Sequence, residues 1–166
     1  MRVLGIDPGS RITGWGLIVG PISAPRIVEA GVIRLDARGR SFSERLARLH
    51  AEIAELVRRL EPGCCAVEAP FHGSSARSSL QLAHARGVIL AALAAESLEP
   101  AEYSPAEIKK AVVGNGRADK GQVAVMVERQ LQADRLEGPA DLTDALAVAL
   151  CHLSTRRFAA LVQGAS

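Results

Sequence analysis

Two short apolar segments of this chain each end in a carboxylate, and this pattern limits how the chain can fold. Residues 2–6 have the composition of a strand that stops at Asp7, before a turn that begins with Pro8. Residues 64–67 form a second short apolar strand, which runs directly into Glu68. Both carboxylates are therefore expected to project from the ends of strands.

Two further acids, Asp141 and Asp144, lie three residues apart in a tract of Ala, Leu and Val that extends to Leu153. Residues with this spacing share one face of an α-helix. Asp141 alone could simply cap the helix after Gly138 and Pro139. Asp144 lies inside an apolar helix, so it must meet a cation, accept hydrogen bonds or face solvent. Acids at the ends of three separate segments predict one shared cation site.

The nature of that cation follows from the residue types available. The cysteines and histidines of the chain do not have the spacing of zinc ligands, so carboxylates are the candidate ligands. Carboxylate oxygens favour a hard cation such as Mg²⁺ or Mn²⁺. Cys64 and Cys65 are adjacent on a predicted strand and should point to opposite faces, and Cys151 lies on an apolar helix. These three residues are expected to be buried free thiols.

Composition sets wider bounds. With 166 residues, 48% of them hydrophobic, the chain is long enough for one well-filled core, and we expect a single domain over residues 1–166. A net charge of +2 permits a polyanionic partner without requiring one. The chain contains no apolar run of the roughly 18 residues needed to span a bilayer and no signal-peptide pattern at its start. We expect no membrane association and a cytoplasmic location.

The order of predicted elements indicates an α/β fold. The chain opens with three predicted strands, over residues 2–6, 13–19 and 27–35. A helix that begins with the Ser41/Glu44 capping box, a strand over 64–67, a helix from 75 or 77 to 96 and a short strand over 101–103 follow. The remaining predicted elements are helices that start at Ser104 and that extend over 119–132 and 141–162. This order predicts a mixed five-stranded β-sheet with helices on both faces. Residues 88–95 are apolar nearly all round, so we also expect this helix to lie in a subunit interface.

Several ordered motifs make a family resemblance specific. The opening signature of the RuvC family of bacterial Holliday junction resolvases resembles the segment Gly5-Ile6-Asp7-Pro8-Gly9-Ser10-Arg11 with Thr13-Gly14-Trp15-Gly16. Further motifs of the family are matched in the same order by Val67-Glu68-Ala69-Pro70-Phe71, Ala85-Arg86-Gly87-Val88, residues 108–114, Lys120-Gly121-Gln122-Val123 and residues 141–147. It extends over essentially the full length. It implies an RNase H-like fold and a homodimer.

The resemblance also implies a function. Such a protein would be a structure-specific endodeoxyribonuclease, which resolves four-way DNA junctions by paired symmetrical nicks in recombination and repair. Its catalytic and metal-binding residues would be Asp7, Glu68, Asp141 and Asp144, which would hold two Mg²⁺ ions, with Mn²⁺ as a substitute. Metal-dependent phosphodiester hydrolysis requires no histidine base. Branch-migration motor proteins of the RuvA and RuvB type would be its partners.

Three further residues are candidates for binding the nucleic acid. Lys109 and Lys120 match basic positions of the family, although both could also be ordinary solvated helix lysines. Phe71 follows Glu68 in a loop and is expected to stack on an unpaired junction base, or alternatively to pack in the core. The chain departs from the usual family pattern at Ser74-Ser75 and at Ala83-His84.

Other readings stay open on sequence alone. A phosphotransferase or ATPase of the sugar-kinase, actin and chaperone superfamily also has an acidic turn after its first strand, but it needs two such domains around its nucleotide. A relative of RNase H or of the YqgF type would share the fold and the acids. A non-catalytic module that binds junctions would use the acids for a structural ion only.

Overall fold

The computed structural model describes residues 1–35, 39–69 and 75–164, with side chains described as far as Arg156. Its elements in chain order are β1 (Arg2–Asp7), β2 (Ile12–Val19), β3 (Arg26–Arg34), α1 (Phe42–Leu60), β4 (Cys64–Glu68), α2 (Ala76–Ala95), β5 (Pro100–Tyr103), α3 (Pro105–Val113), α4 (Lys120–Gln130) and α5 (Ala140–Gly164). Every predicted element is present, and the boundaries move by one or two residues. Within the described ranges, no helix is both long and apolar enough to cross a membrane.

The strands form one mixed five-stranded sheet with the order β3-β2-β1-β4-β5. The first three strands make an antiparallel meander, and β4 pairs with β1, and β5 with β4, in parallel. Strands β1 and β4 therefore end at the same edge of the sheet. The predicted mixed sheet is confirmed.

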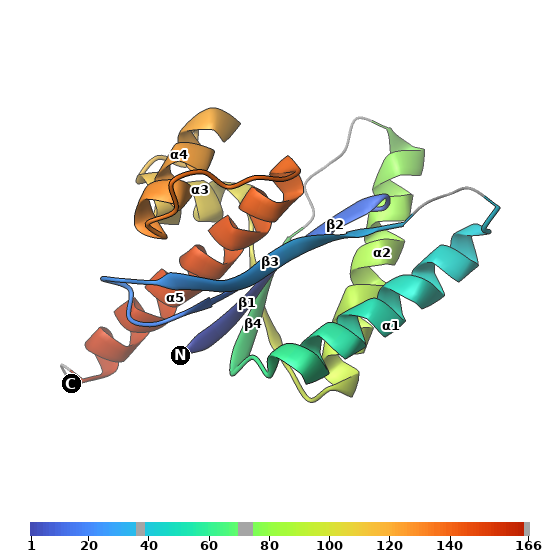
Figure 1. Ribbon diagram of the computed structural model, residues 1–166, viewed down its shortest axis with the longest axis horizontal. Coiled ribbons are helices and arrows are strands. Elements are labelled where there is room, and N and C mark those ends of the chain that lie inside the picture. The colour runs from blue at the N-terminus through green and yellow to red at the C-terminus, as the bar shows by residue number, and fades with distance from the viewer. Residues whose placement is uncertain (36–38, 70–74, 165–166) are drawn as a thin grey trace.

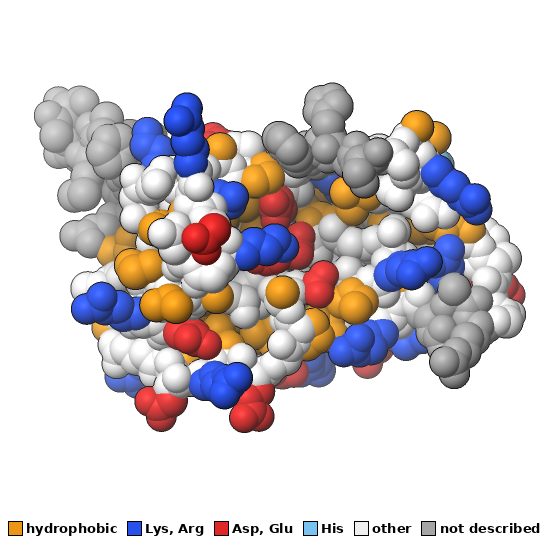
Figure 2. Space-filling model, turned by 90° about the horizontal axis from the view of Figure 1, so that it is seen from above, with side chains coloured by type: hydrophobic (Ala, Val, Ile, Leu, Met, Phe, Trp, Pro, Cys, Tyr) orange, Lys and Arg blue, Asp and Glu red, His pale blue; other side chains and the backbone are white. Residues whose placement is uncertain are grey.

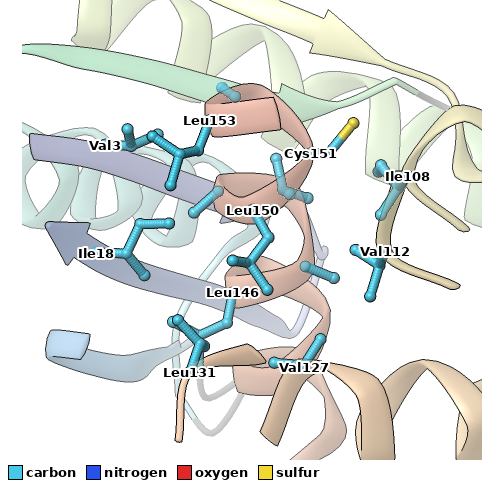
Figure 3. Packing of buried hydrophobic residues seen from close by; sticks show 14 of the residues in the cluster. Val3, Ile18, Ile108, Val112, Val127, Leu131, Leu146, Leu150, Cys151 and Leu153 are labelled. Carbon is cyan, nitrogen blue, oxygen red and sulfur yellow. The ribbon is translucent and has the colours of Figure 1, made fainter. Parts of the chain in front are cut away.

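Helices cover both faces of the sheet, as predicted (Figure 1). Helices α1 and α2 pack on one face, where residues such as Leu4 and Ile6 are buried. Helices α3, α4 and α5 cover the other face, where α5 lies against Val3 and Ile18 and contacts α3 and α4 on its outer side (Figure 3). Cys64 and Cys65 belong to the two different cores, and with Cys151 they are buried free thiols.

Local signals at the helix ends agree with the structure. The Ser41/Glu44 capping box starts α1, and Ser104 starts α3, each with the reciprocal hydrogen bonds of the motif. Gly114 ends α3 with φ of 83°, a left-handed conformation that favours glycine. Asp141 is not the cap of α5, because the helix already includes Ala140. The simple capping role that the sequence left open for Asp141 is thus not what the structure has.

Helix α5 lies unusually close to the sheet because three residues beneath it lack side chains. A Cβ atom at Gly5 would lie 2.2 Å from the carbonyl oxygen of Ala145, and one at Gly14 would lie 1.9 Å from that of Asp141. A Cβ at Gly16 would overlap a leucine of the same helix. Only glycine permits this approach of backbone to backbone. The distance of α5 from the sheet, and with it the position of Asp141 and Asp144, is therefore set by the glycines of β1 and β2.

Helix α2, which is expected to be covered on more than one side, is covered on one side by residues of this chain. Ala85, Ile89 and Leu93 are fully buried against the sheet and α1. The opposite side carries exposed small residues and Leu80, which is 61% exposed. A helix of this composition with one face open still needs a covering partner.

We expect Gly5→Ala to lower the free energy of unfolding by at least about 2 kcal/mol, because the new methyl group overlaps the backbone of α5. Gly63→Ala is the matched control, since a Cβ there meets its nearest atom at 3.6 Å, an ordinary contact. Urea unfolding followed by circular dichroism measures both variants. Equal stability of the two would contradict the close approach.

Candidate active site

The ends of β1 and β4 bring the first two predicted acids together. Ile6 and Val67 are register partners in this parallel pair, so Asp7 and Glu68 follow them at the same edge of the sheet. Both residues line a cleft of about 530 Å³. Figure 2 views the molecule from this side and shows acidic and basic side chains next to each other near the middle of the face.

Helix α5 supplies the other two acids. Asp144 lines the same cleft as Asp7 and Glu68. Asp141 lies one turn earlier, where its backbone rests over Gly14, and does not itself line the cleft. It is nevertheless near enough for its charge to raise the pKa of Asp7. The structure thus gathers all four predicted acids, three of them at the cleft and one beside it.

This gathering makes Asp7 a weak acid. Burial contributes most to raising its pKa from 3.8 to about 8, followed by the charges of Glu68, Asp144 and Asp141. The pKa of Glu68 is also raised, first by burial and then by the charge of Asp144. A hydrogen bond between the two raises the pKa of Asp7 and lowers that of Glu68. Burial and mutual repulsion thus raise the pKa of both carboxyl groups.

The opposite wall of the cleft carries positive charge. Lys109 from α3 and Lys120 from α4 both line it, as does the start of α3 at Ser104. The Nζ atom of Lys120 donates a hydrogen bond to Oδ2 of Asp144 at 3.1 Å. Both lysines lower the pKa of Glu68, against the effect of burial. Both lysines that the sequence analysis selected therefore lie at the cleft, and their role in binding DNA stays a prediction.

The turn after β1 is held by a residue that the sequence analysis did not select. The Oγ1 atom of Thr13, which is fully buried, donates to the Gly9 carbonyl at 3.1 Å and accepts from the Gly9 amide at 3.3 Å. These bonds close the turn through which the chain leaves Asp7. Thr13 was visible in the sequence only as part of the Thr13-Gly14 motif.

A second contact that the sequence did not reveal ties the edge strand to α5. Tyr103 is the register partner of Glu68, and its hydroxyl lies 2.9 Å from Nδ1 of the buried His152. This contact fixes β5, which leads directly into the cleft wall at Ser104. Ser104 was recognised in the sequence as a helix cap, which located the start of α3 but not the cleft. His152 thus has a structural contact within the fold and does not line the cleft.

Phe71 lies outside the described residues, as does the first residue of the Ser74-Ser75 departure from the family pattern. His84, in the second departure, is exposed on α2. Its ring contacts that of Phe42 edge to face, with centroids 5.7 Å apart. This departure therefore lies over α1 and α2 and does not line the cleft.

The donor set at the cleft suits a hard divalent cation. It consists of carboxylate oxygens, and their crowding makes a negative field that a cation would relieve. In the described part of the chain, however, no three acidic, imidazole or thiol groups are positioned so that they could coordinate one ion. Asp144 is turned to Lys120, and Asp7 is hydrogen-bonded to Glu68. The chemistry of the site therefore fits a metal, and binding requires these contacts to open.

Comparison with known proteins gives one consistent family. The family model for the crossover junction endodeoxyribonuclease RuvC matches residues 3–152. A protein of that description from Oleidesulfovibrio alaskensis is 46% identical over 164 residues, which cover 99% of this chain and 97% of the relative. Another from Magnetococcus marinus is 44% identical over 95% of this chain and 87% of the relative.

Solved structures agree with the sequence comparison. Thermus thermophilus RuvC in complex with a Holliday junction substrate superimposes with a TM-score of 0.90 at 31% identity, with 96% of each chain covered. The yeast mitochondrial Holliday junction resolvase Ydc2 shares the fold, with a TM-score of 0.71 at 16% identity over 94% of this chain and 80% of the other. The fold is thus RNase H-like, as predicted, and the chain belongs to the RuvC family of crossover junction endodeoxyribonucleases.

Proposed function

We propose that this protein is an endodeoxyribonuclease that cuts four-way DNA junctions by metal-dependent hydrolysis of phosphodiester bonds. The observation that carries the proposal is the convergence of Asp7, Glu68 and Asp144 in one cleft, opposite two lysines. Family membership supplies the substrate class, because a relative of the same fold is described in complex with a Holliday junction.

The four acids would hold the metal, and we propose two Mg²⁺ ions, with Mn²⁺ able to replace them. Bound divalent ions would polarise the scissile phosphate and lower the pKa of the attacking water. The residues of the chain would position the ions and supply the negative charge that attracts them. Asp7, at the end of the central strand, would hold the metal together with Glu68, Asp141 and Asp144.

The lysines would act on the DNA. Lys109 and Lys120 place positive charge on the wall that faces the acids, where the phosphate backbone would lie. The first turn of α4 adds the partial positive charge of a helix start beside Lys120. We propose that Phe71, three residues after Glu68 in the sequence, stacks on an unpaired base at the crossover.

A homodimer would supply two equivalent sites for paired cuts on a two-fold substrate. The surface that supports it is a shallow groove of about 460 Å³ along α2 and α1, lined by Leu46, Ala83, His84, Gly87, Val88 and Ala91. A Cβ at Gly87 would meet nothing within 4 Å, so another helix has room to approach closely there. We further propose that the dimer works beside RuvA- and RuvB-type motor proteins, on the strength of family membership.

Asp7→Asn should reduce junction cleavage by more than about a hundredfold, because the loss of a direct metal ligand exceeds the usual effect of losing an outer-shell contact. Junction affinity should change little, since Lys109 and Lys120 on the opposite wall of the cleft remain in place. Cleavage is measured on a synthetic branch-migratable junction with Mg²⁺ or Mn²⁺ and with chelator, beside linear duplex and an RNA:DNA hybrid.

Asp134→Asn is the control, since Asp134 is exposed and lies away from the cleft. Normal cutting by Asp7→Asn would refute the assignment of the site. Cutting of the hybrid alone would point to an RNase H, and binding without any cutting would point to a structural junction binder.

The raised pKa of Asp7 predicts how stability depends on pH without metal. A carboxyl with a pKa of 3.8 when unfolded and about 8 when folded binds its proton more tightly in the folded state. The folded protein therefore loses stability as the pH rises from about 4 to about 8. In chelator, the thermal midpoint of the wild type should fall over this range relative to that of Asp7→Asn. Parallel profiles for the two proteins would contradict the shift.

Leu80→Glu should convert the dimer to a monomer at micromolar concentration, because it places a charge on the open face of α2. Val125→Glu is a matched control on α4, since Val125 is 62% exposed and Leu80 is 61% exposed. Size-exclusion chromatography with light scattering gives the mass of each variant. A dimer that survives Leu80→Glu but not Val125→Glu would move the interface to α4.

A further inference from the structure

The ion pair between Lys120 and Asp144 joins α4 to α5 at the cleft, in addition to the packing of these helices in the core. Lys120 lies in the first turn of α4, and Asp144 lies on the second turn of α5. The Nζ atom is 3.1 Å from Oδ2 of Asp144. The lysine side chain is 78% exposed, whereas that of Asp144 is 25% exposed. The long lysine thus reaches from solvent to a half-buried acid.

This pair occupies a carboxylate that the proposed metal site needs. Asp144 lies close enough to Asp7 and Glu68 for its charge to raise the pKa of both. The ammonium group of Lys120 balances part of the negative charge of the cleft through this contact. The ammonium group sits on one of the oxygens that a cation would use.

Lys109 shows that the pair is not a general property of lysines on this wall. It lines the same cleft and lowers the pKa of Glu68, yet within the described residues its Nζ lies within 4.0 Å of no carboxylate. Of the two lysines that line the cleft, Lys120 is the one paired with an acid of the cluster, so the contact depends on its position and not on the charge of the wall as a whole.

We propose that Lys120 is a placeholder cation, which competes with a divalent ion for Asp144 and turns to a DNA phosphate once the ion has taken that carboxylate. This inference rests on the proposed metal site. A divalent ion and an ammonium group repel each other at one carboxylate, so binding of the first favours departure of the second. Departure costs little because the lysine side chain is already mostly exposed, and an ion pair of this kind contributes little to stability.

The exchange would link metal binding to DNA binding through one residue. A lysine released from Asp144 stays at the mouth of the cleft, where it adds a free positive charge for the phosphate backbone. If metal raises affinity for DNA in this way, DNA must raise affinity for metal by the same factor. Lys120 would therefore weaken the binding of metal alone and strengthen the binding of metal with substrate.

The test is direct measurement of Mn²⁺ binding without DNA, by electron paramagnetic resonance of the free ion. Lys120→Met should bind Mn²⁺ about fivefold more tightly than the wild type, a change in keeping with the loss of a partly exposed ion pair. The same variant should cleave the junction more slowly. Lys120→Arg, which keeps the charge, should bind Mn²⁺ as the wild type does.

Lys110→Met controls for the loss of one charge, since Lys110 is exposed on α3 and does not line the cleft. Its affinity for Mn²⁺ should match that of the wild type. In chelator, Lys120→Met should also have a lower thermal midpoint than Lys110→Met, because the acids lose their nearest cation.

The outcomes separate the two proposals. Equal or weaker Mn²⁺ binding by Lys120→Met would overturn the placeholder role and leave the metal site intact. Mn²⁺ binding by the wild type that Asp7→Asn does not weaken would overturn the metal site itself, and the placeholder role with it.

Discussion

The close contact between α5 and the sheet is the constraint on which the site depends. Gly5 and Gly14 let the helix backbone rest directly on β1 and β2, at distances that any side chain would prevent. The acid-bearing turns of α5 are thereby held at the level of Asp7, which ends the central strand. Because protein interiors are densely packed and resist deformation, this contact fixes the spacing of acids from separate segments.

Once the acids are held together, their mutual repulsion governs the chemistry of the cleft. Burial and neighbouring charge keep a proton on Asp7 near neutral pH, and they draw Lys120 onto Asp144. Neither contact is the final state that a nuclease needs. Both lower the energy of a crowded acidic cleft, and a divalent cation bound by the proposed ligands would have to displace both. The affinity for metal would then be a difference between strong attraction to the acids and the loss of these two contacts.

Much of this could be read from the sequence because the signals were local. Asp7 and Glu68 end apolar strands, and Ser41 and Ser104 form capping boxes, so neighbouring residues determine each position. The convergence of the acids was predicted from their coincidence at the ends of separate segments, and the structure supplies the reason, since β1 and β4 pair in parallel and end at one edge. Contacts between distant segments could not be predicted in this way. The bond from Lys120 to Asp144 spans 24 residues, and that between Tyr103 and His152 spans 49.

Helix α2 shows a different limit of sequence reasoning. Its apolar composition predicted burial on more than one side, but within this chain Leu93 and Ile89 are buried while Leu80 stays exposed. Composition alone cannot say whether the second covering layer comes from the same chain or from another copy. The open face lies on the opposite side of the sheet from α5, so a partner could cover it without contacting the helix that carries Asp141 and Asp144. Assembly and catalysis can thus rest on different faces of one sheet, and a change in the open face of α2 need not disturb the acids.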